Sequence, residues 1–525
     1  MQADLKPLEF DSIRRLLERL THTPYGADAA RALEPAPTLA VARDMQRAVT
    51  AARTRIDAAR MPLMGQLPDI RAALRQASTP GARLSTQAMH NIQVVMRACA
   101  ALAEALGDTP EVYPGSLDEL KPPQPVVVLL DDSLQGAGSL REDASPELVE
   151  AFGERARVRG EVEQVVLGRM GRDDIRDRLD DARKVQWNSE RAVIVIRGSE
   201  ADRVKGVRRG SAMGGRDQIV EPMEAVPLNN RLDTLNGRIN AEQQRVLREL
   251  TAGIAQHMAA LEGMLAALTW IDLAFAAGQL SHHMNAHAPT LVEGARVRLE
   301  EAYHPLLLLQ FADGSGPQPV PLTLHLDGDA PLLLVTGPNT GGKTVALKTL
   351  GLIAAMAWCG LHVPAERDCE IGSYTRLIVD VGDHQSLFHH LSTFAGHVEV
   401  LKRILEEADG DTLVLLDELG TGTDPEEGAA LAMAVLDELL ERKVQGIVNT
   451  HLSPLKDYAA HQQGIRNASM QFDHERLAPT YRLVIGEPGV SLGLTIAQKN
   501  GLPEALVERA RAHLAAIAGS GRKSV

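Results

Sequence analysis

The run Pro331-Leu-Leu-Leu-Val-Thr-Gly-Pro-Asn-Thr-Gly-Gly-Lys-Thr344 joins a short apolar stretch to a glycine-rich loop. The apolar part predicts a buried strand, and the residues from Val345 to Trp358 predict the helix that follows. Between them, Gly337 to Thr344 fits the spacing GxxxxGK[ST], which is trusted only in this strand and helix context. The stretch therefore predicts an α/β domain with a phosphate-binding loop.

Different residues of the loop are expected to bind the phosphates of ATP and the Mg²⁺ ion. Backbone N–H groups of Gly341, Gly342 and Lys343 are expected to meet the phosphates at the positive end of the helix dipole. The Lys343 ammonium is expected to reach the β- and γ-phosphates, and the Thr344 hydroxyl to bind Mg²⁺. The predicted ATP-binding residues are Gly337, Pro338, Asn339, Thr340, Gly341, Gly342, Lys343, Thr344 and Val345.

Two further apolar runs, Leu413–Leu416 and Gly446–Val448, predict buried strands that end in polar residues. Strands that alternate with helices imply a parallel sheet with its ligands at the carboxyl ends of the strands. Asp417 is then placed to hold Mg²⁺ through water, and Glu418 to orient and polarise the attacking water. Two adjacent carboxylates favour such a site because a cation offsets their repulsion.

The segments after these strands carry weaker signals. His451 can sense the γ-phosphate within such a site, although an isolated histidine at a strand end is more commonly structural. In the loop before the next helix, Asp424 is a good N-cap, Pro425 suits the first helical position and Glu427 completes a capping box. This local role is enough to explain those three residues.

The first half of the chain reads mainly as helix. Helical spacing of apolar residues continues to about Gly107, and a proline-rich stretch followed by Val126–Leu130 suggests a connector or edge strand. Arg191–Arg197 is β-branched and strand-like, and it lies between charged helical sequence and a long helix pattern from Asn229 to about Leu280. A helix pair that leaves and returns around a β-rich tip predicts a lever with a small clamp.

The predicted fold class is therefore a multidomain α and α/β protein, with a helical core and lever, a β-rich clamp insertion and a P-loop (ABC-like) ATPase domain. The expected domains are a first helical part at 1–150, an arm with the clamp at 151–228, returning lever helices at 229–290, the ATPase domain at 291–515 and a tail at 516–525.

Composition limits the class of protein further. With 525 residues, two to four domains are the reasonable expectation. The three cysteines show no paired spacing, and the first ten residues contain no apolar signal segment. The longest apolar stretches are interrupted by Asp272 or are shorter than the roughly 20 residues that span a bilayer. These features predict a reduced cytoplasmic protein without membrane association.

Charge is unevenly distributed over the chain. The net charge is −14, yet Arg155 to Arg216 contains 16 Lys or Arg against 10 Asp or Glu, a local net charge of +6. This segment suggests one surface for an anionic partner, and the candidate nucleic-acid contacts are Lys205, Arg208 and Arg209; solvated helix faces are the plainer alternative. Aromatic residues make up only 3% of the chain, so successive base-stacking platforms are not expected.

Several motifs together resemble the MutS family. They are Thr336–Thr344, Asp383-His-Gln-Ser386, Leu391-Ser-Thr-Phe394, Asp417–Thr423 and Thr450-His451. In that family the Ser-Thr-Phe segment opens a helix whose serine reaches the nucleotide of the opposite subunit. Ser392 is the matching position, so the resemblance implies a homodimer with shared ATP sites, in which Glu418, Lys343, His451 and Ser392 take part in catalysis.

Within the family, the chain is most similar to the second bacterial paralogue, MutS-II. This similarity rests on the segments His304-Pro-Leu306, Lys343–Lys348, Gly420–Gly428, Pro479–Arg482 and Gly489–Leu494. The mismatch-reading domain of the mismatch-repair protein has no counterpart, and Phe152-Gly-Glu154 matches its Phe-x-Glu motif only in a charged helical stretch. MutS-II proteins usually continue into a Smr domain with nuclease activity, whereas this chain stops at Val525, so we expect no nuclease activity from it.

Three functions agree with these observations. The first is an ATP-gated homodimeric clamp on branched DNA, such as a recombination intermediate, without mismatch recognition. The second is an ATPase that acts on stalled or collided ribosomes, where ribosomal RNA presents the same anionic backbone. The third is a transporter or metabolic ATPase, which is disfavoured because the Leu-Ser-Gly-Gly signature of transporter ATPases is absent from the sequence.

Overall fold

The computed structural model describes residues 1–136, 138–179, 184–337, 341–381, 393–473, 478–489, 494, 497–498 and 501–520. The chain divides into two compact units. The first unit comprises Met1–Gln66, Leu102–Asp118 and Ala266–Val525, and the second comprises Leu67–Ala101 and Glu119–Leu265. The domain boundaries predicted from the sequence stay predictions.

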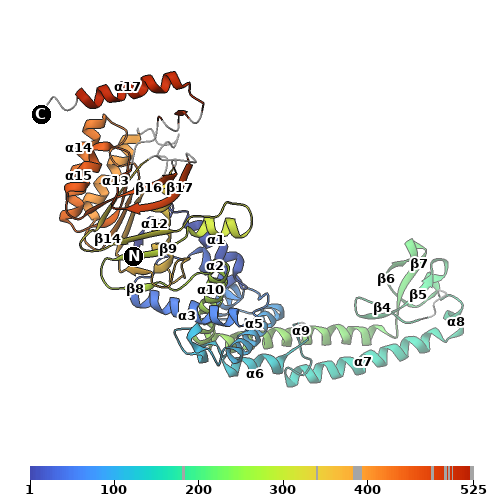
Figure 1. Ribbon diagram of the computed structural model, residues 1–525. Helices are drawn as coiled ribbons and strands as arrows, with labels where there is room; N and C mark the ends of the chain where they lie inside the picture. The colour runs from blue at the N-terminus through green and yellow to red at the C-terminus, as the bar shows by residue number, and fades with distance from the viewer. Residues whose placement is uncertain are drawn as a thin grey trace. The chain divides into compact units, whose positions relative to one another are not determined.

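A seven-stranded sheet lies at the centre of the first unit (Figure 1). In spatial order its strands are β1 (Gln2–Ala3), β13 (Arg376–Asp380), β14 (Thr412–Leu416), β15 (Gln445–Thr450), β11 (Leu332–Thr336), β16 (Ile465–Asp473) and β17 (Ala478–Ile485). All neighbouring strands are parallel except β16 and β17. The three buried strands predicted around the glycine loop are therefore confirmed, and their carboxyl ends share one edge of the sheet.

Helices cover both faces of this sheet. On β11, Leu333 and Val335 belong to the core that contains α12 (Lys343–Trp358), whereas Leu332 and Leu334 belong to a second core. The second core contains residues of α13 (Thr393–Glu407), α14 (Pro425–Glu441) and α15 (Ser453–His461). Because side chains alternate across a strand, a strand that is apolar at every position must be buried on both faces.

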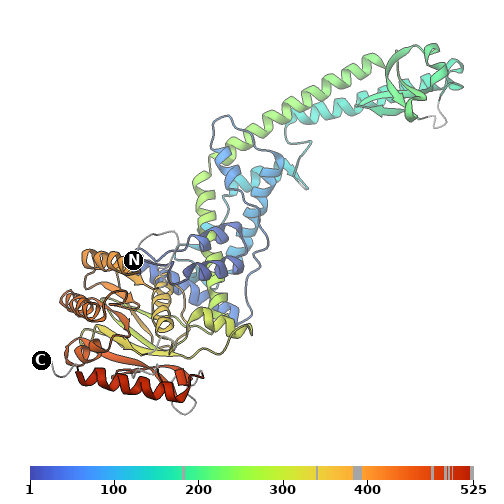
Figure 2. The ribbon, with the colours of Figure 1, turned by 90° about the horizontal axis from the view of Figure 1, so that it is seen from above.

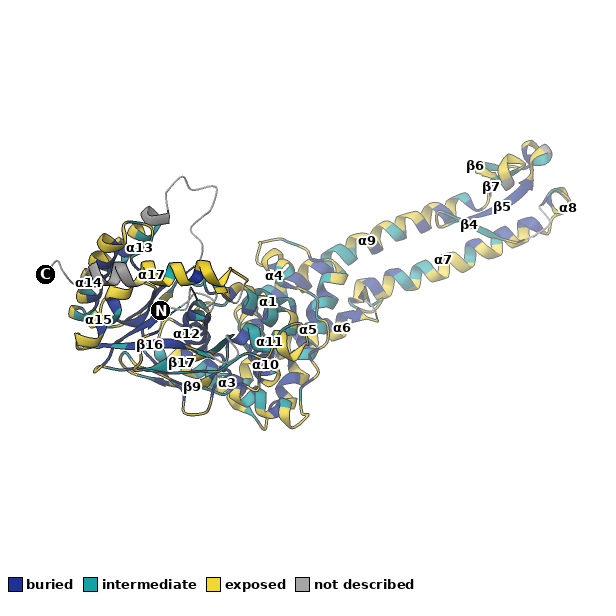
Figure 3. Cartoon of the chain, turned by 45° about the horizontal axis from the view of Figure 1, so that its top comes forward, coloured by how far each residue is buried: buried dark blue, intermediate teal, exposed yellow. Residues whose placement is uncertain are grey.

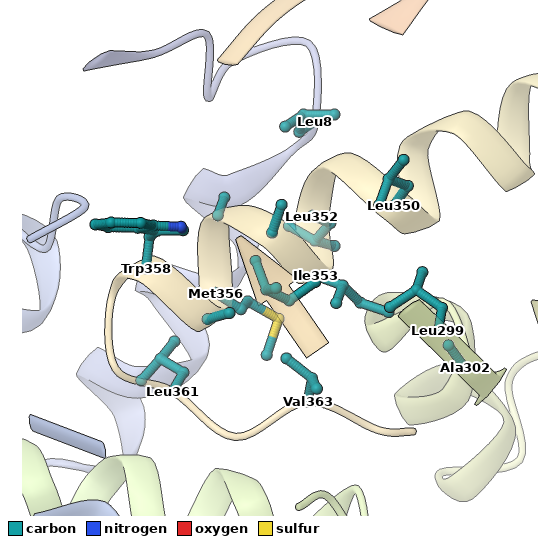
Figure 4. Close-up of a cluster of buried hydrophobic side chains, with 14 of the residues drawn as sticks. Leu8, Leu299, Ala302, Leu350, Leu352, Ile353, Met356, Trp358, Leu361 and Val363 are labelled. Atoms are coloured by element: carbon teal, nitrogen blue, oxygen red, sulfur yellow. The ribbon is translucent and has the colours of Figure 1, made fainter. Parts of the chain in front are cut away.

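Helix α12 directly follows the glycine loop, and most of its residues are buried. Figure 4 shows Leu350, Leu352, Ile353 and Met356 of α12 within one apolar cluster, and Leu350, Leu352 and Ile353 are fully buried. Burying a side chain of this size stabilises the fold by about 1.5–3 kcal/mol. The loop is therefore anchored between a buried strand and a buried helix.

The remaining elements of the first unit surround this layer. A four-stranded sheet has the order β10 (Leu322–Leu326), β9 (Val297–Ala302), β12 (Glu370–Gly372) and β8 (Thr290–Val292). The other helices are α1 (Phe10–Leu20), α2 (Pro24–Arg31), α3 (Leu39–Asp57), the end of α10 (Met258–His283), α11 (Pro305–Ala312) and α17 (Glu504–Ser520), with a 3-10 turn at Pro110–Val112 and another at Leu117–Leu120. Figure 3 shows most of the part of α17 from Glu504 to Leu514 as exposed.

Among the described residues, α10 is the one helix that by length and composition could cross a bilayer, and 56% of its most apolar window is buried within the protein. Core helices pass the same test, so this is weak evidence for a membrane span. The Asp272 side chain is fully buried in α10 and accepts hydrogen bonds from the backbone N–H groups of His22 and Thr23, at 2.9 and 2.8 Å. A buried carboxylate satisfied in this way suits the interior of a folded unit.

The second unit contains a helix pair with a small sheet. Its helices are α4 (Arg71–Ala77), most of α5 (Thr86–Ala105), α6 (Gln124–Ser133), α7 (Pro146–Met170), α8 (Asp173–Arg176) and α9 (Val226–Ala255). Strands β2 (Leu134–Gln135) and β3 (Ser139–Leu140) form a short hairpin. The small sheet, Gln186–Pro222, has the order β4 (Gln186–Asn188), β5 (Arg191–Arg197), β7 (Asp217–Pro222) and β6 (Gly206–Ala212), with 3-10 turns at Gly198–Arg203 and Met213–Gly215.

Figures 1 and 2 both show α7 and α9 side by side, with the small sheet packed at one end of the pair. Val158 and Val162 of α7, Leu232 of α9, and Ile194 and Ile196 of β5 belong to one buried cluster. The strand predicted at Arg191–Arg197 is confirmed at the same bounds. A β-rich insertion between two long helices is thus present.

Two details of the helical first half differ from expectation. Val126–Leu130 is part of helix α6 rather than a connector or edge strand, because Pro125 suits a helix start and the buried Val126 and Leu130 are one helical turn apart. The long pattern from Asn229 to Leu280 is two helices, α9 and α10, with Gln256 and His257 between them.

Candidate functional site

Glycines shape the loop at the end of β11. Gly337 and Gly342 have φ values of 124° and 96°, which side chains rarely adopt. A Cβ atom on Gly341 would lie 3.0 Å from Cβ of Met470, so the loop also passes close to β16. Pro338, Asn339 and Thr340, which are predicted ATP-binding residues, lie outside the described residues.

Lys343 is the first residue of α12 and is only 1% exposed. Its Nζ atom donates hydrogen bonds to the carbonyl oxygens of Gly337 at 2.6 Å and Thr450 at 3.3 Å. Burial lowers the pKa of Lys343, whereas the nearby carboxylates of Asp417 and Glu418 act in the opposite direction. The ammonium group therefore lies between the glycine loop, the end of β15 and the acidic pair after β14.

Thr344, Asp417 and Asn449 are brought into direct contact at the same edge. The Thr344 hydroxyl donates to Oδ2 of Asp417 at 2.6 Å, and Nδ2 of Asn449 donates to Oδ1 of Asp417 at 3.0 Å. Asn449 is fully buried, and its Oδ1 has no hydrogen-bond partner among the described residues. Hydroxyl and carboxylate oxygens are the ligands that Mg²⁺ prefers, and a buried unpaired acceptor suits an ordered water. This oxygen set fits the predicted Mg²⁺.

Glu418 follows Asp417 with a left-handed backbone, at a φ of 56°. Such a conformation is uncommon for a residue other than glycine and persists only where neighbours hold it. Here the Leu419 N–H donates to the carbonyl of Asn449 at 3.0 Å, and the Thr421 N–H donates to the carbonyl of Glu418 at 3.2 Å. These bonds fix the turn that carries Glu418 beyond the sheet edge.

The loop from Gly420 to Gly428 closes on itself. A Cβ atom on Gly428 would lie 2.1 Å from the carbonyl oxygen of Gly420, so only glycine permits this approach. Oδ1 of Asp424 accepts from the N–H groups of Glu426 at 2.9 Å and Glu427 at 3.4 Å. Asp424 is therefore the N-cap of α14, as predicted, and the loop is held next to Glu418.

His451 follows β15 directly and is exposed. It adjoins Thr450, whose carbonyl accepts the Lys343 bond and whose hydroxyl donates to the carbonyl of Leu419 at 3.1 Å. The histidine is thus at the same edge as the lysine and the acidic pair. Ser392, the predicted contact to an opposite subunit, lies outside the described residues.

An apolar cavity of about 230 Å³ adjoins the glycine loop. It is lined by Gly342, Val345, Pro319, Met470 and Tyr481, among others. Val345, a predicted ATP-binding residue, is 42% exposed and contributes to this lining. The sequence motif could not reveal the cavity, because its walls come from segments far from the loop in the chain.

Sequence reasoning also assigned no role to Asp380, His397 and Asn449. Asp380 and Asn449 stand at or near the ends of buried strands β13 and β15, which is the signal that identified Asp417. His397 lies on α13 and had no such signal, yet its Nδ1 atom lies 2.8 Å from Oδ2 of Asp380. All three are buried or nearly so at the same edge of the sheet.

In the second unit, the three candidate nucleic-acid residues differ in their surroundings. Arg209 donates from Nε to Oε2 of Glu221 at 2.6 Å, and the Glu221 side chain is fully buried. Arg208 forms an ion pair with Asp202. Lys205 is exposed and forms no ion pair with any residue that the structure describes. Of these three residues, Lys205 is therefore the one without a carboxylate partner among the residues that the structure describes.

Phe152-Gly-Glu154 has ordinary structural surroundings. The segment lies inside α7, where the Arg155 guanidinium stacks 4.7 Å from the Phe152 ring centroid. The Glu154 carboxylate accepts from Arg231 at 2.5 Å and from Arg238 at 3.4 Å. The residues therefore pair along the helix surfaces of α7 and α9. The three cysteines are buried and free. Among the described residues, no cluster of three or more His, Cys, Asp or Glu side chains that could hold a metal ion is found.

Comparison with known proteins places this arrangement in a family. Residues 333–518 match MutS domain V. A protein of Thermus thermophilus named Endonuclease MutS2 is 37% identical over 98% of this chain and 66% of its own length. Proteins with the same name from Halothermothrix orenii and Pelotomaculum thermopropionicum are 32% and 34% identical over 97% and 98% of this chain, and 64% of their own lengths.

The mixed α/β fold, with its glycine loop at the edge of a largely parallel sheet and the matched domain, defines a protein of the MutS class. The chain belongs to the MutS family and is of its MutS2 type, because relatives of that name match it over nearly its whole length. It spans just under two thirds of the length of these relatives. The transporter alternative is thereby removed.

Proposed function

We propose that the protein is a Mg²⁺-dependent ATPase whose site lies at the carboxyl edge of the seven-stranded sheet. The observation that carries this proposal is the contact of Thr344 with Asp417, together with the buried Lys343 beside the same carboxylate. Thr344 and Asp417 would hold Mg²⁺, which offsets phosphate charge when it is bound. Lys343 and the N–H groups of Gly341 and Gly342 would bind the phosphates.

In this proposal Glu418 acts on the attacking water. A carboxylate beside the metal ligand can accept a hydrogen bond from the water and align it with the γ-phosphorus. The fixed turn after Asp417 supports this role, because it carries Glu418 past the end of β14 rather than into the sheet. The exposed His451 at the end of the neighbouring β15 would sense the γ-phosphate.

The apolar cavity beside Gly342 is proposed to receive the nucleotide base. Its volume of about 230 Å³ and its mainly apolar walls suit a flat aromatic ring. Val345 borders both the cavity and the first turn of α12. A base in this cavity would leave the phosphates directed toward the helix N-terminus.

The test compares Glu418→Gln with Lys343→Ala. Glu418→Gln should retain ATP binding and lose most ATP turnover, since the amide keeps the size of the side chain but loses its charge. Lys343→Ala should lose both, since the phosphates lose their cation. Turnover is measured as released phosphate and binding by equilibrium dialysis. Equal turnover in the wild type and Glu418→Gln would remove Glu418 from the proposed mechanism.

We also propose that the protein works as a homodimeric clamp on branched DNA, without mismatch recognition. Support for the clamp comes from the MutS2 type of the chain and from the helix pair with its small basic sheet. The absence of mismatch recognition is supported by the structural partners of the Phe-x-Glu segment, since Phe152 stacks with Arg155 and Glu154 pairs with Arg231. The relatives carry the name endonuclease; the residues argued above account for ATP hydrolysis only. An ATPase of stalled ribosomes, contacting ribosomal RNA, is the alternative.

One experiment separates these partners. The protein is purified from cells in low salt, and the nucleic acid that accompanies it is identified as chromosomal DNA or ribosomal particles. Recovery with DNA, together with tighter binding to four-way junctions than to linear duplexes of equal length, supports the clamp. Recovery with ribosomal particles and no preference for junctions would move the proposal to the ribosome.

A further inference from the structure

Asp380 and His397 form a hydrogen-bonded pair at the edge of the proposed ATPase site. Nδ1 of His397 lies 2.8 Å from Oδ2 of Asp380, and the two side chains are 14% and 4% exposed. An ionised carboxylate can only accept, so the imidazole carries its proton on Nδ1. A ring held through one nitrogen has its plane and its second nitrogen fixed in direction.

The pair is tied to the acidic residues after β14. Asp380 ends β13, which pairs in parallel with β14, and the Asp417 N–H donates to the Asp380 carbonyl at 2.8 Å. The hydrogen bond from Asp380 raises the pKa of His397, and the charges of Glu418 and Asp417 raise it further. The His397 imidazole is therefore held at the end of β13, the strand next to the one that Asp417 and Glu418 follow.

Such a pair can restrain the direction of the Glu418 side chain. The backbone bonds of Leu419 and Thr421 hold the left-handed turn at Glu418, where φ is 56°, but they do not set the direction of its carboxylate. A carboxylate that must align a water also has to be restrained in direction, because misplacement by about 1 Å can lower a rate about 100-fold. A rigid, hydrogen-bonded imidazole with a partial positive charge can supply that restraint.

We propose that His397 is a positioning residue for Glu418 and that Asp380 holds the His397 ring in place for this purpose. This inference rests on the proposed ATPase function. In this role His397 does not contact the nucleotide. Its ring limits the orientations of the Glu418 carboxylate, so that the carboxylate aligns the attacking water with the γ-phosphorus. Turnover should then depend on His397, whereas ATP affinity should not.

Helix α13 offers a matched control for a purely structural role. Six residues beyond His397, Arg403 also joins α13 to the β13 region, since its NH1 donates to Oδ1 of Asp4 at 3.2 Å. Oδ2 of Asp4 in turn accepts from the Val379 N–H at 3.0 Å. Arg403 therefore fastens the same helix, about 9 Å farther along it by helical rise. Loss of this contact tests anchoring alone.

The experiment measures kcat and ATP dissociation constants for His397→Ala, His397→Asn, Asp380→Asn, Arg403→Ala and a double variant that combines His397→Ala with Asp380→Asn. We expect kcat to fall about 10- to 100-fold in His397→Ala, with ATP affinity within about threefold of the wild type. Asp380→Asn should lower kcat less, and the double variant should be no slower than His397→Ala, because both residues act through one contact. Arg403→Ala should stay within about twofold of wild-type kcat.

His397→Asn discriminates between positioning and anchoring. Its amide can still donate to Asp380 but lacks the second ring nitrogen, so it should be as slow as His397→Ala. Recovery of wild-type kcat in His397→Asn, or an equal loss in Arg403→Ala, would overturn the proposal and leave an anchor for α13. Wild-type kcat in a folded His397→Ala would overturn it as well, with folding checked by circular dichroism.

Glu418→Gln separates failure of this inference from failure of the ATPase proposal. If Glu418→Gln loses turnover while the His397 variants keep it, only the positioning role is wrong. If the wild type does not hydrolyse ATP, or Glu418→Gln turns over normally, the proposed function itself is wrong and the positioning role falls with it.

Discussion

The side-chain amide of Asn449 donates to Asp417, with 3.0 Å between Nδ2 and Oδ1. Because the Thr344 hydroxyl donates to the other carboxylate oxygen at 2.6 Å, both oxygens of Asp417 are restrained. Asn449 stands next to last in β15, so the rigid sheet determines the direction of the carboxylate. A residue that orients a metal ligand is commonly worth 10- to 100-fold in metal affinity or activity, by order of magnitude.

Asn449→Ala should therefore raise the Mg²⁺ concentration needed for half-maximal ATP turnover by about 10-fold. The measurement is a Mg²⁺ titration at saturating ATP. Asn467→Ala is the matched control, since Asn467 is also a buried asparagine on a strand of this sheet but donates to a backbone carbonyl, that of Lys456, at 3.0 Å. An equal Mg²⁺ shift in both variants would indicate a general loss of packing.

Stability should depend on pH through His362. Its ring nitrogens lie 2.9 Å from the Thr50 hydroxyl and 2.8 Å from the Ser281 hydroxyl, and burial lowers its pKa to about 4. The unfolded chain binds this proton near pH 6.5, so between about pH 6.5 and 4 the unfolded state holds more protons. The stabilising contribution is thus complete above about pH 6.5 and is lost as the pH falls toward 4.

We expect the free energy of unfolding to fall by about 1–3 kcal/mol between about pH 6.5 and pH 4 because of His362. Urea unfolding at several pH values measures the reduction. His362→Gln should remove this part of the pH dependence, and His283→Gln, at an exposed position at the end of α10, should leave it unchanged. The same pH slope in His362→Gln and the wild type would assign the effect to other groups.

The sequence predicted those parts of the site that local patterns determine. A leucine-rich run, a glycine loop and an apolar helix follow one another between Pro331 and Trp358, so their order alone indicates the loop's context. Asp417 and Glu418 were found because they end a buried strand. These features need no knowledge of distant contacts.

Features made by distant side chains were not predictable. The Arg209 and Glu221 pair spans 12 residues, and His397 and Asp380 are 17 apart with a strand and a helix as their supports. No period in the sequence joins such residues, because the sheet register and helix packing decide which of them meet. The prediction of a connector or edge strand at Val126–Leu130 was wrong because the valines there favour strands locally. In the structure they belong to helix α6, which buries Val126 and Leu130 on one face.

A shared active site should appear as complementation between variants. The prediction is motivated by the Ser-Thr-Phe motif, in which Ser392 matches a residue that reaches the opposite subunit's nucleotide. Mixing Ser392→Ala protomers with Lys343→Ala protomers would give mixed dimers with one site complete in both residues. ATP turnover should partly return, to above that of either variant alone. Mixed dimers without recovered turnover would argue for self-contained sites.

The last prediction concerns nucleic-acid binding by the small sheet, where the structure changes the expected contributions. Glu221 is fully buried and accepts from Arg209 at 2.6 Å, from NH2 of Arg191 at 2.7 Å and from Nδ2 of Asn229 at 2.8 Å. Arg209→Ala should therefore lower the free energy of unfolding by about 1–3 kcal/mol, since a charged hydrogen bond to a buried carboxylate is lost. Lys205→Ala should change it by less than about 0.5 kcal/mol.

DNA binding should depend on these residues in the opposite order from stability, with Lys205 contributing more than Arg209. If Lys205 neutralises one phosphate, Lys205→Ala should weaken junction DNA binding and lower the slope of log affinity against log salt by about 0.9. Replacing Lys205, Arg208 and Arg209 together would lower it by roughly 2–3 if all three were free, but the pairing of Arg208 with Asp202 and of Arg209 with Glu221 makes a change near 1 the expectation.

Fluorescence anisotropy at several salt concentrations measures these slopes on labelled four-way junctions, with the folded fraction of each variant fixed by circular dichroism. A decrease near 1 for both Lys205→Ala and the triple variant supports a single free cation. A decrease of 2–3 for the triple variant would mean that the two arginines exchange their carboxylates for phosphates. An unchanged slope for DNA beside weakened binding to ribosomal particles would favour the ribosomal partner, and no change for either would leave the basic segment a solvated surface.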